Sequence, residues 1–481
     1  MNEASRIRQQ FQSGLWPQFV EYIEIHNVRS WKGQGVNFVY PVTAIVGENG
    51  TGKSTILKSL ACCYENPNDP KKSFYPSQFF IDTQWESLTN CTLNYRVKTG
   101  DNSTTFSIRK PTQRWKYPKN RIKRNVYFLD ISRTLPLDAT VGYAKLAKQA
   151  QEEVSDVVLS DDNRNQLSYI RGRNYGSARF AKTDYDQLKE VGLLGRNFGE
   201  ISQFHQGAGE DATLDLFQVL ESLPNYSLLL IDEVEASLHP KAQRRLMKFL
   251  LNLSRVKRVQ IVVSTHSPYI LSELPTEARI LLLPNERDEL AIITNVSTEF
   301  AMSKIDDSDN PEIFLYVEDN EASTLIYEIV KHNDPRDLLI PRIKTVVVGP
   351  ANVVQTMGNL SDSNQLPIPG LGVLDGDIED STGCIKLPGD TAPEILVYNA
   401  LKAENWPNLD SRFGIGAGTL FTILEEAILL PDHHDWNKYV GDKIRMSSKM
   451  VWQILSQEWC RECLSQDDST RIIDEINRKL N

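Results

Sequence analysis

The segment 47–55 reads GENGTGKST and fits the phosphate-loop pattern G-x-x-x-x-G-K-[ST]. The apolar run at 43–46 before it is typical of a buried strand, and residues 55–61 after it are typical of a helix. The pattern requires this context, because the loop amides and the helix N-terminus then surround phosphate oxygens together. The segment therefore predicts an α/β fold that binds a nucleoside triphosphate.

Individual residues of this loop have expected roles. Lys53 is expected to reach the β- and γ-phosphates of ATP, and the Ser54 hydroxyl is expected to bind Mg²⁺. The other expected nucleotide contacts are Asn49, Gly50, Thr51, Gly52 and Thr55.

Two further apolar runs, at 227–231 and 259–264, are typical of buried parallel strands, and each leads into polar residues. Asp232 follows the first run, where it is expected to share the Mg²⁺ with Ser54. Glu233 is expected to orient or deprotonate the attacking water. His266 follows the second run and is expected to contact the γ-phosphate.

A second acidic group stands farther along the chain. Glu318 ends the strand-like run 312–318, and Asp375 and Asp377 follow another at 370–374. Carboxylates at the ends of neighbouring parallel strands can converge on one or two Mg²⁺ ions, which polarise a phosphodiester and activate water. Glu394 is a further carboxylate for this site, or an ordinary acidic residue in the first turn of a helix.

The phosphate loop, Asp232-Glu233, the sequence ASLHP at 236–240 and His266 together resemble the ATP-binding-cassette type ATPases of the RecF, SMC and OLD (overcoming lysogenization defect) group. The resemblance implies that two ATPase heads sandwich ATP, so a homodimer or higher homo-oligomer is expected. Each head would lend a signature loop to the other's nucleotide. Here that loop corresponds to 206–210, with the expected contacts Gly207, Gly209 and Glu210.

The stretch from about 312 to 401 resembles a Toprim domain, and an ATPase head followed by Toprim is the layout of OLD nucleases. The expected fold class is α/β. An ABC-type ATPase domain at 1–305 carries a helical insertion at about 135–200, a Rossmann-like Toprim domain with a parallel sheet spans 306–410, and a helical region spans 411–481. Two positions depart from the family pattern: Asp319 replaces a glycine, and Ala322 replaces an acid.

The resemblance implies an ATPase that regulates a Mg²⁺-dependent (or Mn²⁺-dependent) DNA endonuclease in bacterial anti-phage defence. The alternative is an ATP-driven scaffold with a degenerate Toprim domain, which sequesters or positions a separate nuclease or toxin. A second defence-system protein or a nucleic acid is a further expected partner.

Charge and composition add two expectations. The net charge is −10, but the segment 109–124, RKPTQRWKYPKNRIKR, contains no acid. It is either a solvated basic loop or a nucleic-acid contact, the latter through Arg114, Trp115, Lys116, Arg121, Lys123 and Arg124. No apolar run approaches the ~20 residues that cross a bilayer, so no membrane contact and a cytoplasmic location are expected.

Overall fold

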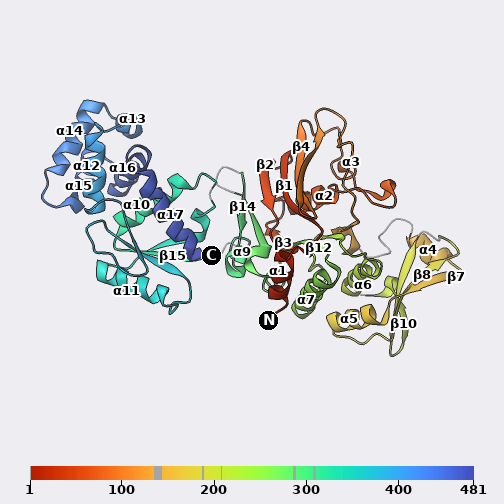
Figure 1. Cartoon of the computed structure of the whole chain (residues 1–481). Helices are drawn as coiled ribbons and strands as arrows, with labels where there is room; N and C mark the ends of the chain where they lie inside the picture. Colours follow the sequence, from red (N-terminus) through yellow and green to blue (C-terminus); the bar gives the residue numbers. More distant parts are fainter. Residues whose placement is uncertain are drawn as a thin grey trace. The chain divides into compact units, whose positions relative to one another are not determined.

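The computed structural model describes residues 2–134, 143–186, 189–206, 208–284, 289–306, 310–336 and 338–480. The chain divides into two compact units, Met1–Ser308 and Asp309–Asn481 (Figure 1). Both units combine helices with parallel strands, which confirms the predicted α/β class. Within the described ranges, no helix is long and apolar enough to cross a membrane.

A mainly parallel sheet forms the centre of the first unit. Its strands run in the order β14 (Leu290–Thr294), β13 (Arg279–Pro284), β3 (Val42–Gly47), β12 (Gln260–Thr265), β11 (Leu228–Ile231) and β6 (Val126–Leu129). Only the β13–β14 pair among these is antiparallel.

Strands β3, β11 and β12 are buried along their whole length. Continuous apolar runs suit parallel strands that are covered on both faces. Because β12 lies between β3 and β11, the carboxyl ends of these three strands meet at one edge of the sheet. The phosphate loop and the residues after both apolar runs therefore share that edge.

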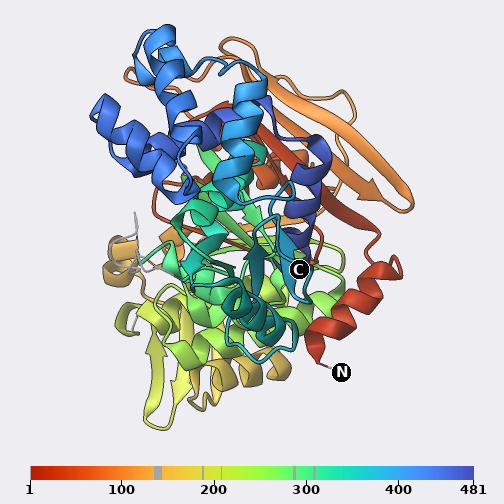
Figure 2. The ribbon, with the colours of Figure 1, turned by 90° about the vertical axis from the view of Figure 1, so that its left-hand side faces the viewer.

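The first unit also contains an antiparallel sheet and several helices beside this central sheet (Figure 1). An antiparallel sheet has the order β2 (Trp31–Asn37), β1 (Gln18–Val28), β4 (Cys91–Thr99) and β5 (Asn102–Lys110). Figure 2 shows β4 and β5 as a long orange hairpin, with pairing from Cys91↔Lys110 to Thr99↔Asn102. The helices outside the insertion are α1 (Glu3–Gln12), α2 (Lys53–Ala61), α3 (Pro76–Phe79), α6 (Ala208–Glu221), α7 (Pro240–Lys257), α8 (Pro268–Leu271) and α9 (Thr298–Ser303).

The insertion corrects the sequence prediction, which expected mainly helix at about 135–200. Helices α4 (Tyr143–Gln149) and α5 (Asp161–Arg171) are present, but the described insertion has more strand than helix and contains an antiparallel sheet. Its strands run in the order β10 (Gly199–Ser202), β9 (Glu190–Arg196), β8 (Ser177–Thr183) and β7 (Glu153–Val158). Residues 135–142 and 187–188 lie outside the described ranges.

The physical reason lies in β7, which has no buried face, whereas β8 and β9 bury part of their residues. Every residue of β7 is exposed, so its sequence has no alternation of apolar and polar positions. Arg179 of β8 instead forms ion pairs with Glu153 and Asp156 of β7, and with Glu200 of β10 at 2.8 Å. Charge pairs between strands stabilise such a sheet without the period-two signal.

The second unit contains a parallel sheet in the order β16 (Ile343–Val347), β15 (Ile313–Val317), β17 (Gly370–Leu374) and β18 (Cys384–Lys386). Helix α10 (Asn320–Asn333) connects β15 to β16, and α11 (Ala351–Asp362) connects β16 to β17. The carboxyl ends of β15 and β17 are neighbours, as the sequence predicted.

The C-terminal helices pack on the same core as this sheet. They are α12 (Pro393–Ala403), α13 (Leu409–Phe413), α14 (Ala417–Ile428), α15 (Trp436–Ile444), α16 (Ser448–Glu462) and α17 (Gln466–Leu480). Leu420, Leu424 and Leu455 are buried in one cluster with Ile313 and Leu315. The indole N–H of Trp452 on α16 also donates to the Glu321 carbonyl on α10 at 2.9 Å.

Candidate functional site

The phosphate loop has a backbone that requires glycine. Gly47, Gly50 and Gly52 have φ angles of 155°, 86° and 95°. A Cβ on Gly47 would lie 2.5 Å from the Leu282 carbonyl oxygen, so no larger residue fits without a shift of the backbone. The loop ends at Gly52, which directly precedes the N-terminus of α2, and a helix N-terminus can attract a phosphate.

Lys53 joins the loop to the neighbouring strand end. Its Nζ donates to the carbonyl oxygens of Gly47 at 2.9 Å and Glu48 at 3.0 Å, and lies 2.7 Å from His266 Nε2. Burial lowers the pKa of Lys53, while the nearby carboxylates of Glu233 and Asp232 act in the opposite direction. An ammonium group in this place can stabilise phosphate charge.

His266 also approaches the residue expected to orient water. His266 Nε2 lies 3.3 Å from Glu233 Oε1. Burial by itself raises the pKa of Glu233, but His266, Lys53 and Arg133 outweigh it, and the net shift is downward. Glu233 is therefore ionised at neutral pH, in the form that can accept a proton from water.

Ser264 links the two acidic residues at the end of β11. Its Oγ donates to Asp232 Oδ1 at 2.5 Å and accepts the Glu233 N–H at 2.8 Å. Asp232 is buried, and Glu233 has a left-handed backbone with φ of 49°. A non-glycine residue in this conformation is strained, and such strain persists where the surrounding contacts fix it. These contacts hold the two carboxylates in a fixed arrangement near Lys53.

Sequence reasoning missed two residues of this site. Arg133 donates to the carbonyl oxygens of Asp232 at 2.6 Å and Glu233 at 2.7 Å. The Glu235 carboxylate accepts the His266 N–H at 2.5 Å, which ties β11 to β12 beyond their ends. The available signals were a third acid two residues after Glu233, and an arginine shortly after the strand that ends at Leu129.

The expected signature loop is described only in part. Gly207 lies outside the described residues, and Gly209 belongs to α6. The Glu210 carboxylate is buried, where it accepts from Tyr175 Oη at 2.6 Å and pairs with Arg173 and Arg196. The Glu210 side chain thus holds α6 to the insertion of its own chain, a different role from the expected contact with a nucleotide.

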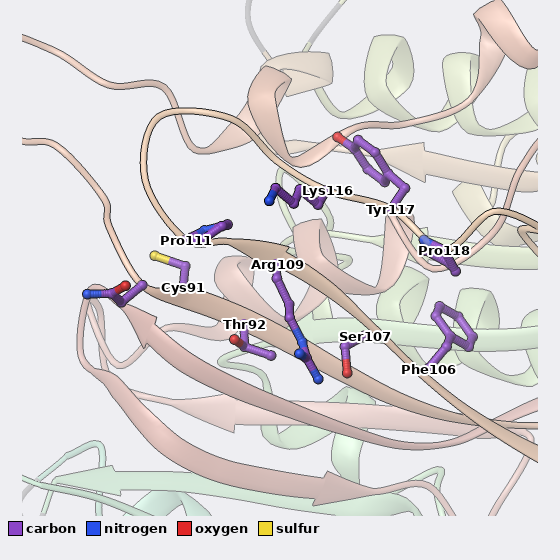
Figure 3. A pocket seen from close by; sticks show the side chains of 10 residues that line it. Cys91, Thr92, Phe106, Ser107, Arg109, Pro111, Lys116, Tyr117 and Pro118 are labelled. Carbon is purple, nitrogen blue, oxygen red and sulfur yellow. The ribbon is translucent and has the colours of Figure 1, made fainter.

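The basic segment 109–124 separates into two kinds of residue. Arg114, Lys116 and Lys123 are exposed, and Trp115 is half-buried. Arg109 and Lys116 line an open cavity of about 710 Å³ between the β4–β5 hairpin and the following loop (Figure 3). The exposed side chains of Arg109, Arg114, Lys116 and Lys123 are free to contact a polyanion.

The structure corrects the expected nucleic-acid role of Arg121 and Arg124. Arg121 Nη2 donates to the carbonyl oxygens of Cys62 at 2.9 Å and Tyr64 at 2.7 Å. Arg124 is buried and donates to the Tyr226 and Ser227 carbonyl oxygens at 2.7 and 3.0 Å. Local charge in the sequence does not reveal that both guanidinium groups satisfy backbone carbonyls inside the fold.

This arrangement gives a prediction about stability. We expect Arg124→Ala to lower the free energy of unfolding by at least roughly 1.5–3 kcal/mol, because buried carbonyl groups lose charged donors. Lys116→Ala, at an exposed position, is the matched control and is expected to leave the thermal unfolding temperature unchanged. Equal unfolding temperatures for both variants in calorimetry would contradict the structural role of Arg124.

A group of carboxylates lies at the edge of the second sheet. Glu318 follows β15, and Asp375 follows the neighbouring β17. Burial raises the pKa of Asp375 to about 7, and the charges of Asp319, Glu318 and Asp377 add to the shift. Burial also raises the pKa of Glu318, with contributions from Asp319 and Asp377. The carboxylates of Glu318, Asp375 and Asp377 therefore interact electrostatically, and their role as metal ligands stays a prediction.

In the part of the chain that the structure describes, Glu318, Asp375 and Asp377 do not form a group whose ligand atoms all lie within 4.8 Å of one another, but Asp375 has an oxygen that a cation can use. Among the described residues, Asp375 Oδ1 is buried and has no hydrogen-bond partner. Gly376 lets the two aspartates turn closely past another segment, because a Cβ there would lie 2.7 Å from the Gly389 carbonyl oxygen. Asp319, which departs from the Toprim pattern, caps α10 by accepting the Ala322 N–H at 2.8 Å. Mutually repelling carboxylates with an unused buried oxygen favour a divalent ion with oxygen ligands.

A family model and solved structures are similar to parts of the chain. The family described as "AAA domain, putative AbiEii toxin, Type IV TA system" matches residues 143–272, which include Asp232, Glu233 and His266. The SMC head domain from Thermotoga maritima is 13% identical, with a TM-score of 0.35, over 58% of this chain and 99% of that one.

Three curated relatives are similar to the chain over about half its length. Septu protein PtuA of Bacillus mycoides is 22% identical over 58% of this chain, which spans only 43% of that protein. The OLD nuclease of Thermus scotoductus is 22% identical over 54% of this chain and 61% of the relative. "Retron Vc95 probable ATPase" of Vibrio cholerae is 30% identical over 55% of this chain and 73% of the relative. On this last match, the chain belongs to the family of ATPases that includes the retron Vc95 protein.

Proposed function

We propose that the chain binds and hydrolyses ATP at the edge where β3, β12 and β11 end. Lys53 would contact the β- and γ-phosphates, and the loop residues from Asn49 to Thr55 would surround them with N–H groups. Ser54 and Asp232 would hold Mg²⁺, which neutralises developing phosphate charge when bound. The observation that supports this proposal is the contact of His266 Nε2 with both Lys53 Nζ and Glu233 Oε1.

The roles of the two remaining polar groups follow from their positions. Glu233 would orient the attacking water and accept its proton, and its lowered pKa keeps the carboxylate ionised at neutral pH. His266, beside Lys53, would sense the γ-phosphate. A second copy of the chain would complete the site through the backbone at Gly207 and Gly209, so the active form would be a homodimer or higher homo-oligomer.

We further propose that Glu318, Asp375 and Asp377 hold Mg²⁺ or Mn²⁺ for the cleavage of DNA. The ions, when bound, would polarise the phosphodiester and activate a water molecule. The unused Asp375 Oδ1 and the repulsion within the cluster support this role. Exposed Arg114, Lys116 and Lys123 would contribute phosphate contacts.

The relatives indicate the biological setting that we propose. They are a Septu protein, a retron ATPase and an OLD nuclease, so ATP-regulated DNA cleavage in anti-phage defence is the function that we infer. A second protein of such a system, or a nucleic acid, would be the partner.

A plasmid-nicking assay of the purified chain tests the proposal. We expect conversion of supercoiled to open-circular DNA with Mg²⁺ or Mn²⁺, and none with EDTA. ATP hydrolysis is measured in the same samples. Hydrolysis without nicking under any of these metals would instead support a scaffold whose carboxylate cluster is not catalytic.

A further inference from the structure

A second group of metal-ligating side chains lies in the C-terminal unit. Glu394 stands in the first turn of α12 and is only 1% exposed. Its Oε1 lies 3.1 Å from His434 Nδ1, but its Oε2 is buried without a hydrogen-bond partner among the residues that the structure describes. A buried carboxylate oxygen with no donor is costly, so this atom indicates a missing ligand.

Two adjacent histidines face this carboxylate. His433 and His434 form a short 3₁₀ turn, which Asp432 caps by accepting the His434 N–H at 3.0 Å. Their rings have centroids 4.1 Å apart. One ligand atom from each of Glu394, His433 and His434 lies within 4.8 Å of the others.

This distance is close to that of a metal site. Two ligands on one zinc ion lie about 3.4 Å apart when each bond is about 2.1 Å long. The present cluster is somewhat wider. The His434 side chain is 59% exposed and has room to rotate toward the ion.

The surroundings favour a cation. The negative charge of Asp319 contributes toward a higher pKa at Glu394 and at both histidines. Asp432 contributes in the same direction at both histidines, and Asp377 does so at His433. An ion pair between His434 and Glu394 Oε1 does not provide a partner for Glu394 Oε2, and it gives His433 no role.

We infer that Glu394, His433 and His434 form a binding site for a first-row transition metal such as Zn²⁺, separate from the all-carboxylate site of Glu318, Asp375 and Asp377. Two imidazoles and a carboxylate are a donor set that zinc prefers and that magnesium does not. Three protein ligands leave a fourth position open for a water or a phosphate oxygen. Asp319 and Asp377, which interact with this cluster, also belong to the acidic cluster around Asp375, so the two sites would be neighbours. The inference goes beyond the proposed nuclease function and does not depend on it.

Zinc binding by the full-length chain tests this inference. Zn²⁺ is titrated against a chromophoric chelator in the presence of excess Mg²⁺, and the bound metal is counted by elemental analysis. We expect one Zn²⁺ per chain, with tetrahedral Co²⁺ absorption bands when Co²⁺ is used instead. His433→Ala and His434→Ala should each weaken Zn²⁺ binding by at least about 10-fold, and Glu394→Gln should do so without a large change in volume.

Two control variants make the result specific. His332→Ala removes an exposed histidine at the end of α10, and Asp375→Asn changes a carboxylate that is not one of the three proposed Zn²⁺ ligands. Both should retain Zn²⁺, and circular dichroism should show that every variant is folded. Unchanged Zn²⁺ affinity in folded His433→Ala and His434→Ala would overturn the inference. Loss of nicking with intact Zn²⁺ binding in Asp375→Asn would separate it from the proposed function.

Discussion

Glu233→Gln is expected to lower the rate of ATP hydrolysis by roughly 100- to 10,000-fold, the usual contribution of a general base. The amide has nearly the same shape as the carboxylate but cannot accept a proton from water. Lys53 and the glycine loop are unchanged, so ATP binding should persist. The variant should therefore retain ATP on a filter and form a more stable dimer in size-exclusion chromatography with light scattering.

A matched variant separates this effect from general damage. Glu86→Gln alters an exposed glutamate of the same unit and should hydrolyse ATP like the wild type. If Glu233→Gln also hydrolyses ATP at the wild-type rate, Glu233 does not act on the attacking water. If it loses ATP binding instead, the carboxylate supports the fold of the loop rather than the chemistry.

Asp375→Asn is expected to abolish metal-dependent nicking while ATP hydrolysis continues. An asparagine has one neutral oxygen in place of a carboxylate and binds Mg²⁺ weakly. Nicking is measured on supercoiled plasmid with Mg²⁺ or Mn²⁺. Asp380→Asn, at an exposed position in the same loop, is the control and should cut normally. Undiminished cleavage by Asp375→Asn would place the nuclease elsewhere.

The same variant has a predicted effect on stability. Burial raises the pKa of Asp375 from 3.8 to about 7, so the native state keeps a proton that the unfolded state has lost between these values. Stability therefore falls as the pH rises through this range. Without divalent metal, the unfolding temperature of the wild type should decrease between about pH 5 and pH 7.5, and that of Asp375→Asn should decrease less. Identical pH profiles would contradict the raised pKa.

Much of the ATP site could be predicted from the sequence because its signals are local. The phosphate loop is continuous, and each apolar run identifies a strand whose carboxyl end holds Asp232 or His266. Parallel strands then bring these ends to one edge. Arg133 could not be found in this way, because it acts on the carbonyl oxygens of Asp232 and Glu233, far along the chain.

Burial explains where the sequence was misleading. Arg124 belongs to a run of basic residues, but only the folded chain places its guanidinium against the carbonyl groups of Tyr226 and Ser227. The sequence predicts helix where the insertion has strands, because β7 is exposed and is paired through Arg179. His433 and His434 gain meaning only from Glu394, which lies about forty residues away in sequence.

We propose that ATP bound to the first unit controls cleavage at the acidic cluster of the second. The most direct test is the nicking rate of Glu233→Gln with and without ATP, compared with Lys53→Ala. Coupling between two sites is commonly worth a roughly 5- to 150-fold effect. We predict a change of this size when ATP is added to Glu233→Gln, and no change for Lys53→Ala. Equal nicking rates of Glu233→Gln with and without ATP would contradict the claim.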